Sequence, residues 1–163
     1  IGIEPPSSSP NLTMELNAAV VPSFSSIYYG QAFSVQTNII NNSSSTFTGD
    51  YSAAVFDANG NFVEYVEVMT NMSLPAGYTY TSNLVFSSAG SLAMLPGSYT
   101  ISIFYKPSGG NWIAVGGTSL YPNSASITVT NPNDMELYAP INISGGGTLK
   151  NGQSVTVTTD VAN

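Results

Sequence analysis

The sequence predicts an all-β fold, an antiparallel β-sandwich, and three observations lead to this prediction. Apolar residues recur at every second position in several segments, which is the period of a strand with one buried face. Gly, Pro and Asn gather between these segments, where they favour turns. No window of the sequence has a sustained helical period.

The predicted strands follow one another at short intervals. Phe33 to Ile39 alternates apolar and polar residues, as a half-buried strand does. Tyr51 to Phe56 is a more continuous apolar run and predicts a central strand. With the segment that begins at Met14, the chain offers about seven to eight strands, the number found in a sandwich. The other strands are expected at Phe62–Val68, Tyr78–Phe86, Tyr99–Tyr105, Trp112–Val115 and Ala125–Thr130.

Turn residues separate these segments. Asp57-Ala58-Asn59-Gly60 predicts a tight hairpin turn, because Asn and Gly accept positive φ angles at low cost. One segment is ambiguous: in Ser87 to Leu95, Ala, Leu and Met favour a short helical turn across the end of the sandwich. Further turns are expected at Leu74-Pro75-Ala76-Gly77, Leu95-Pro96-Gly97-Ser98 and Gly109-Gly110-Asn111.

An internal repeat is the strongest organisational signal in the chain. Met14-Glu15-Leu16 recurs as Met135-Glu136-Leu137, a shift of 121 residues. The segment from Gly30 to Ile39 recurs from Gly152 to Val161, a shift of 122 residues, so one residue is inserted between the two blocks. Two ordered blocks with a shared apolar pattern predict two copies of one module.

The repeat divides the chain into three parts. Residues 1–10, rich in Pro and Ser, are expected to form a stiff polar linker. Residues 11–130 hold one full module, and residues 131–163 hold a second linker and the first two strands of a second, truncated copy. These two strands, near Glu136–Ile143 and Gln153–Val161, would lack their partners. We therefore expect the tail to pair with a sheet edge of another copy.

Three local motifs carry a resemblance to a known family. They are Gly30-Gln31 followed by an alternating strand, Leu-Pro-Ala-Gly at 74–77, and Leu-Pro-Gly-Ser-Tyr at 95–99. In these motifs the chain resembles the tandem immunoglobulin-like and fibronectin-III-like domains of bacterial extracellular proteins, including the cell-adhesion-related type. The resemblance implies an Ig-like sandwich and neighbouring repeats as partners. It also implies a tyrosine corner at Tyr99, whose hydroxyl would bond back to the turn backbone.

The composition is poor in charge. Charged residues make up 7% of the chain, its two basic residues are Lys106 and Lys150, and the formal net charge is −7. Two lysines cannot neutralise a row of phosphates, which excludes a nucleic-acid partner, and an anionic membrane surface is disfavoured. No apolar run is long enough for membrane insertion. A neutral surface of Ser, Thr, Asn and Gly predicts an extracellular or cell-surface location.

Most catalytic groups are missing from the sequence. It has no histidine, cysteine or arginine, which removes Ser-His-Asp triads, thiol nucleophiles and most transition-metal sites. A carboxylate pair remains conceivable, since glycosidases need only two. Glu64 and Glu67, however, are three residues apart, which puts them on opposite faces of one strand and predicts solvated edge charges. We therefore predict that the protein is not an enzyme and has no cofactor.

The turn at Asp57 offers oxygen ligands for a hard cation. Asp57, Asn59 and Asn61 faintly resemble a calcium loop, but Val68 stands where such a loop has its bidentate Glu. A hairpin turn explains the same residues, so no metal site is predicted.

Aromatic residues are the remaining candidates for a ligand site. Several of them fall at predicted strand ends or loops, where a strip for stacking against sugar rings could form. The alternative is that these rings fill the core or cover loop bases, as aromatic side chains do in sandwiches. The candidates are Trp112, Tyr105, Tyr121, Tyr28 and Tyr29.

Two functions stay open at this level. The first is a non-catalytic spacer, adhesion or protein-interaction module of a bacterial surface or secreted protein, supported by the repeat, the linker and the missing catalytic groups. The alternative is a carbohydrate-binding module attached to a secreted enzyme. That alternative rests on the aromatic and Asn/Thr content and requires exposed, coplanar rings.

Overall fold

The computed structural model describes residues 13–88, 92–116 and 124–131 in full, and residues 136–137, 142–144, 156–158 and 161–162 as backbone strands. The chain divides into two compact units, Ile1–Thr130 and Asn131–Asn163. The described residues of both units form strands, turns and bends, with no helix among them. The all-β prediction is therefore confirmed.

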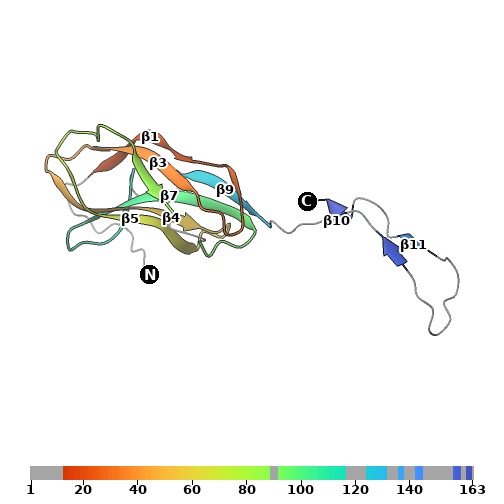
Figure 1. Cartoon of the computed structure of the whole chain (residues 1–163). Coiled ribbons are helices and arrows are strands. Elements are labelled where there is room, and N and C mark those ends of the chain that lie inside the picture. The colour runs from red at the N-terminus through yellow and green to blue at the C-terminus, as the bar shows by residue number, and fades with distance from the viewer. Residues whose placement is uncertain are drawn as a thin grey trace. The chain divides into compact units, whose positions relative to one another are not determined.

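The first unit is a sandwich of two sheets (Figure 1). The smaller sheet has the order β1 (Met14–Pro22), β3 (Ser34–Asn41), β6 (Leu84–Ser87). The larger sheet has the order β2, β9, β7, β4, β5, and a short strand β8 also pairs with β7. This is an immunoglobulin-like arrangement. The bounds of the larger sheet's strands are β2 Ser26–Tyr28, β9 Ala125–Thr130, β7 Gly97–Pro107, β4 Phe47–Phe56, β5 Phe62–Leu74 and β8 Ile113–Ala114.

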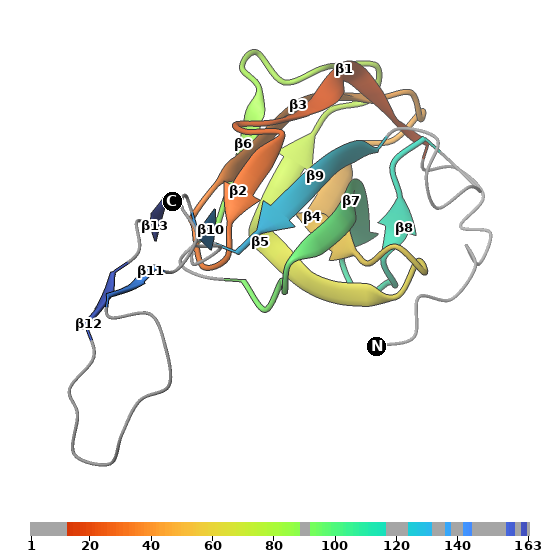
Figure 2. The same cartoon turned by 90° about the vertical axis from the view of Figure 1, so that its right-hand side faces the viewer.

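The first strand passes from one sheet to the other. After β1 the backbone N–H of Ser23 still donates to Ser34 of the smaller sheet (2.8 Å), whereas Ser25 already accepts from Thr128 of the larger sheet (3.0 Å). β2 then runs parallel to β9, with Tyr28 opposite Thr130. Figure 2 shows β9 between β2 and β7. β2, which follows the opening strand, and β9, which closes the module, are thus hydrogen-bonded neighbours.

The core lies between the two sheets. It consists of the side chains that point inward at every second position along the strands. Phe47 is fully buried and contacts Tyr51 (ring centroids 4.8 Å apart) and Tyr105 (5.9 Å, edge to face). Full burial of a large apolar side chain contributes about 1.5–3 kcal/mol to stability. The central strands supply most of these positions: Val35 and Ile39 from β3, Phe47, Tyr51, Ala53 and Val55 from β4, and Ile101, Ile103 and Tyr105 from β7.

A buried amide closes one end of the core. Asn41, 0% exposed, donates from Nδ2 to the carbonyls of Ser45 (2.9 Å) and Leu74 (2.9 Å). Its Oδ1 accepts from the backbone N–H and the hydroxyl of Ser43. All four hydrogen-bonding positions of the amide are therefore used, which is what burial of a polar group requires.

The tyrosine corner is present at Tyr99. Its hydroxyl donates to the carbonyl of Leu95 (2.7 Å), four residues upstream, while its ring packs on the core. The predicted turns at Gly60 and Gly77 also form, with φ angles of 80° and 73° in the left-handed region that glycine adopts without strain.

One predicted strand is shorter than expected. The sequence predicts a strand over Tyr78–Phe86, but the strand begins only at Leu84. Asn38 explains the difference, because its Nδ2 donates to the carbonyls of Tyr80 (3.1 Å) and Ser82 (3.3 Å) and so occupies acceptors that a neighbouring strand would use. The segment pairs with β3 at one isolated bridge, where Thr79 lies opposite Ile40.

Other bounds also differ from prediction. β5 continues to Leu74 instead of ending at Val68, and the strand predicted at Trp112–Val115 is reduced to the two residues of β8. The helical turn expected in Ser87–Leu95 is not found in residues 87–88 and 92–95, and residues 89–91 lie outside the described part of the chain.

The described strands of the second unit form two short antiparallel pairs. β10 (Glu136–Leu137) pairs with β13 (Val161–Ala162), and β11 (Asn142–Ser144) pairs with β12 (Thr156–Thr158), both antiparallel. The two predicted strands of the tail therefore pair with each other. Pairing of this tail with another copy stays a prediction.

Candidate functional site

A second group of apolar side chains lies on the outer face of the larger sheet. Ala54 and Phe56 alternate with the core residues of β4, and Phe104 does so on β7, so their side chains point away from the other sheet. All three are nevertheless at most 2% exposed. Partly buried neighbours surround them: Phe62 and Tyr65 from β5, Trp112 just before β8, and Ala114 within it. We call these seven residues the outer aromatic cluster.

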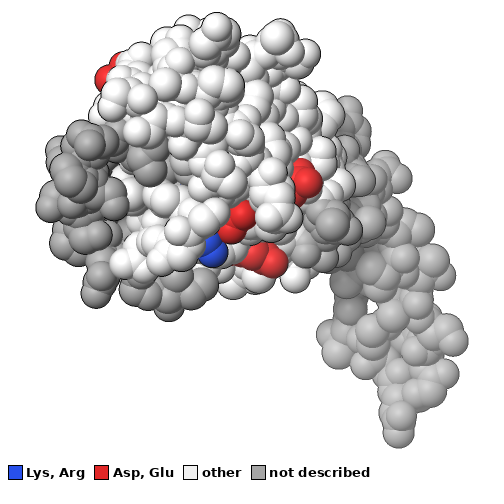
Figure 3. Space-filling view, turned by 90° about the vertical axis from the view of Figure 1, so that its left-hand side faces the viewer, with Lys and Arg blue, Asp and Glu red and all other residues white. Residues whose placement is uncertain are grey.

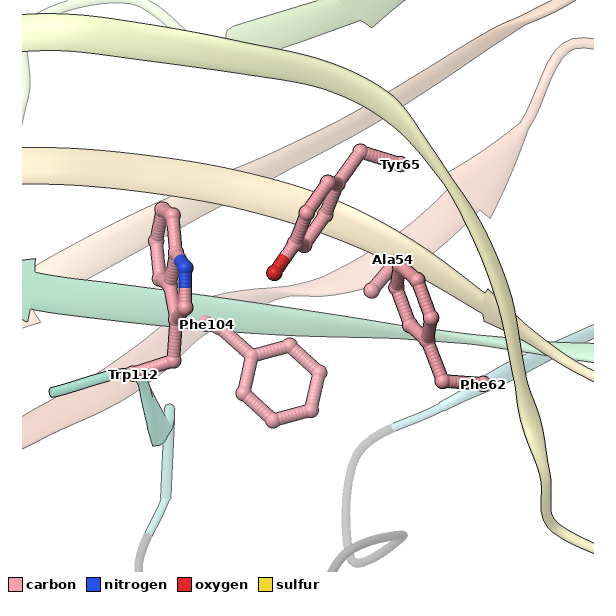
Figure 4. A pocket seen from close by; sticks show the side chains of 5 residues that line it. All are labelled: Ala54, Phe62, Tyr65, Phe104 and Trp112. Carbon is pink, nitrogen blue, oxygen red and sulfur yellow. The ribbon is translucent and has the colours of Figure 1, made fainter. Parts of the chain in front are cut away.

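The rings of the outer aromatic cluster pack against one another (Figure 4). Phe62 and Tyr65 are 4.8 Å apart between centroids at 58°, and Tyr65 and Trp112 are 5.6 Å apart at 40°. Phe56 contacts Phe104 at 5.8 Å with an angle of 41°. Such tilted contacts are favourable between aromatic rings, but they do not produce a flat platform. The hollow between the rings is too small to hold a water molecule.

Charged groups border the cluster on one side. Lys106 Nζ lies 5.3 Å from the centroid of the Trp112 ring, a cation–π distance, and 3.3 Å from Asp50 Oδ2. Asp50 Oδ1 also accepts from the backbone N–H of Asn71 (3.3 Å). Burial of Tyr65 among its neighbours raises the pKa of its hydroxyl. Trp112 therefore contacts both Lys106 and Tyr65.

The structure does not bring the predicted stacking residues together. Trp112 is half-buried in the outer aromatic cluster. Tyr105 is 4% exposed and faces the core, where burial raises its pKa, so it offers no free ring face. Tyr28 and Tyr29 are 60% and 50% exposed at the end of β2. Tyr121 lies outside the described residues.

The cluster contains residues that the sequence did not single out. Phe62, Tyr65 and Phe104 lie beside Trp112, but Phe62 and Tyr65 are three apart, a spacing that normally puts two strand residues on opposite faces. A β-bulge between them restores the common face, since Phe62 pairs with Phe56 and Tyr65 with Ala54. The periodic pattern alone therefore could not reveal this group.

The same bulges correct the prediction for Glu64 and Glu67. Glu67 pairs with Ala53 and Glu64 with Val55, and these two β4 residues are two apart and face the core side. The two carboxylates thus lie on one face of β5, whereas the spacing predicted opposite faces. Bulges shift the side-chain alternation by one residue each time they occur.

These two carboxylates also have backbone partners. Glu67 Oε2 accepts from the N–H of Ser87 (2.7 Å), and Glu64 Oε2 accepts from the N–H of Ala93 (2.8 Å). Ser87 is the last residue of β6, and Ala93 lies within the connection between β6 and β7. The two carboxylates lie on the edge strand β5, as the sequence predicted, and each also bonds a backbone N–H between Ser87 and Ala93.

The Asp57 turn is organised by its own carboxylate. Oδ1 accepts from the N–H groups of Asn59 (2.9 Å) and Asn61 (2.8 Å), and Oδ2 accepts from Asn61 Nδ2 (3.0 Å). These bonds lower the pKa of Asp57, the side-chain amide of Asn61 contributing most. Both oxygens are engaged in the hairpin turn. In the described part of the chain, no three acidic, His or Cys side chains form a group that could hold a metal ion.

Comparison with known proteins gives likenesses of fold. No family model matches the chain, and no curated protein matches it. A β-glucosidase from Erythrobacter marinus has a TM-score of 0.46 and 14% identity over 73% of this chain, which spans 16% of that enzyme. The CARDB domain of a Pyrococcus furiosus protein, in complex with di-metal ions, has a TM-score of 0.42 and 14% identity over 77% of this chain and 98% of that domain.

A third structure is similar at the same level. The C-terminal domain of Wzt has a TM-score of 0.46 and 12% identity, and the alignment covers 75% of this chain and 80% of that domain. These likenesses concern the β-sandwich alone. Nothing in the described residues has the helical length and apolarity needed to cross a bilayer.

Proposed function

We propose that this chain is a non-catalytic, extracellular Ig-like module of a bacterial surface or secreted protein, in which it acts as a spacer or as an adhesion or protein-interaction domain. The outer aromatic cluster is the observation that carries the proposal. Its rings, Trp112 among them, pack against one another and leave no room for a water molecule between them. A cluster packed in this way stabilises a sheet face and needs no ligand to do so.

The chemistry of the surface supports an external location. Charged residues make up 7% of the chain, and the face drawn in Figure 3 carries few of them among many uncharged groups. The sequence also lacks histidine, cysteine and arginine, the residues that most often carry general base, nucleophile and anion-clamp roles. Repeated modules without catalytic groups commonly separate or join other domains.

Affinity electrophoresis tests whether the outer aromatic cluster binds glycans, which the proposal excludes. The purified chain is run through gels that contain soluble plant, fungal or bacterial polysaccharides, next to a Trp112→Ala variant and a Tyr78→Ala control. Tyr78 is 65% exposed and lies outside the cluster. We expect equal mobility of all three proteins in every gel. Retardation that disappears in Trp112→Ala and persists in Tyr78→Ala would overturn the proposal.

Labelling of intact cells tests the location. A membrane-impermeant protease or antibody is applied to the producing bacterium before and after lysis. We expect the module to be reached in intact cells. Access that requires lysis contradicts an extracellular role.

The second candidate, a carbohydrate-binding module, has one specific observation in its favour. Tyr28 and Tyr29 are 60% and 50% exposed at the end of β2, and exposed tyrosine rings can stack on sugars. The same gels distinguish glycan binding by these two tyrosines from glycan binding by the outer aromatic cluster. Retardation lost in Tyr28→Ala or Tyr29→Ala, and kept in Trp112→Ala, would establish a glycan site at the end of β2.

A further inference from the structure

The strand pairing in the second unit repeats the pairing between β1 and β3 residue by residue. The β1 partner of each pair is moved along the chain by 121 residues and the β3 partner by 122, the two shifts of the sequence repeat. Four moved pairs then coincide with pairs of the second unit. They are Glu15–Ile40 with Glu136–Ala162, Leu16–Ile39 with Leu137–Val161, Val21–Gln36 with Asn142–Thr158, and Pro22–Val35 with Ile143–Val157.

The next pair of the second unit follows the same rule. Ser144 pairs with Thr156, and the corresponding Ser23 and Ser34 are joined in the first unit by a backbone hydrogen bond of 2.8 Å. The inserted residue that separates the two shifts falls in the connection between β11 and β12. An insertion there leaves the register unchanged, whereas a slip of one residue inside a strand would turn every side chain to the other face.

The first unit shows what lies on the other edge of this strand. β3 is paired on both sides, with β1 on one and β6 on the other, where Ser34 is opposite Ser87 and Gln36 opposite Val85. β12 occupies the place of Ser34–Gln36 in the second unit. In the described residues of that unit, no strand pairs with β12 besides β11.

We infer that residues 131–163 form the first two strands of a second sandwich of the same kind, and that the open edge of β12 takes an antiparallel strand of the β6 type, Leu-Val-Phe-Ser. The inference goes beyond the function proposed above, because it concerns the residues after Thr130 and depends on neither location nor ligand. Its partner is a further length of the same repeat within the same polypeptide, because β6 of a folded neighbouring module is already paired with its own β3.

An extended chain tests the inference. Asn163 corresponds to Asn41 under the shift of 122 residues, so a copy of residues 42–130 is appended directly after Asn163. We expect the appended segment to become as resistant to a non-specific protease as the first unit. We also expect the amide of Val157 to exchange at least about tenfold more slowly than in the original chain. A folded first unit followed by a protease-sensitive extension overturns the inference.

Two deletions in the extended chain serve as matched controls. Deletion of Gly146, in the connection, removes the inserted residue and is expected to preserve protease resistance of the second sandwich. Deletion of Thr159, between β12 and β13, shifts the register and is expected to abolish that resistance. Equal resistance of both deletions would contradict the shared register.

A measurement on the original chain tests the inference even if the extended chain does not fold. The chain has no cysteine, so introduced thiols have no competitors. Asn142→Cys with Thr158→Cys is expected to form an internal disulfide at least about tenfold faster than Asn142→Cys with Val157→Cys. Equal rates would show that the pairing differs from that of β1 and β3 and would overturn the inference.

Discussion

Single residues in this module act through saturated hydrogen bonding more than through charge. Asn41 is the clearest case. Its fully buried side-chain amide accepts from the N–H of Ser43 in the turn after β3 and donates to the carbonyl of Leu74 at the end of β5. Tyr99 acts similarly at the other end of the sandwich through Leu95. In a chain with few ionisable groups, amides and hydroxyls take the place that ion pairs hold elsewhere.

Asn41→Ala is expected to destabilise the module by about 2–5 kcal/mol, because it leaves the carbonyls of Leu74 and Ser45 and the N–H of Ser43 without a partner. Urea unfolding followed by tyrosine fluorescence measures the loss. The matched control is Asn42→Ala, an exposed neighbour whose side chain donates to Glu15 (2.8 Å). The control is expected to cost less than about 1 kcal/mol, and a similar loss in both variants would contradict the assignment.

The pKa of Asp57 offers a second check at this scale. Hydrogen bonds from Asn61 and Asn59 stabilise the carboxylate, so its pKa is expected below the ordinary aspartate value. A folded-state pKa that is lowered contributes stability above the unfolded pKa, and this contribution is lost as the pH falls through the folded pKa. NMR titration of the carboxyl carbon measures it. Asn61→Ala should raise the value, and an unchanged value would refute the role given to Asn61.

Among the strands, β5 shows how β-bulges bring residues three positions apart to the same face. Its bulges put Phe62 and Tyr65 together on the outer face and Glu64 and Glu67 together on the inner side. The first pair covers the outer face of β4, and the second holds the connection from β6 toward β7. Without the bulges, alternation would place one residue of each pair on the wrong face.

Glu67→Ala is expected to free the N–H of Ser87 from its carboxylate partner. Hydrogen–deuterium exchange should then become faster at Ser87 by about tenfold or more, since this amide is exposed apart from that bond. Glu15→Ala is the control. It removes a carboxylate that accepts from the exposed side chain of Asn42, directly after β3, and should leave the exchange rate at Ser87 unchanged. Slow exchange at Ser87 in Glu67→Ala would show that another group protects it.

The individual strands also show which structural features can be predicted from the sequence and which cannot. Regular alternation predicted β3, a continuous apolar run predicted β4, and Asn59-Gly60 predicted the hairpin that joins β4 to β5, because these signals are local in the sequence. The segment before Leu84 was predicted as a strand, but its carbonyl of Tyr80 accepts from the side chain of Asn38, a contact across 42 residues that no local pattern contains. The outer aromatic cluster was hidden for the same reason, since bulges depend on the packing of β5 against β4.

For the whole molecule, the scarcity of ionisable groups predicts a weak response to salt. Lys106–Asp50 is the one side-chain ion pair among the described residues, and both partners are partly exposed. Raising NaCl from about 0.1 M to about 1 M should therefore change the free energy of unfolding by less than about 1 kcal/mol. Asp50→Asn should show the same salt dependence as the original chain. A steep dependence would reveal charge interactions beyond this pair.

The parallel pairing of β2 with β9 determines how the module would carry tension. A pull transmitted to Ser26 from the preceding chain and to Thr130 from the following chain draws the two strands past each other along their own axes. The bonds that join them then stretch at the same time, whereas an antiparallel hairpin pulled at its ends would open one bond after another. The bonds between β2 and β9 would therefore have to break together before a pull at these two residues could separate the strands.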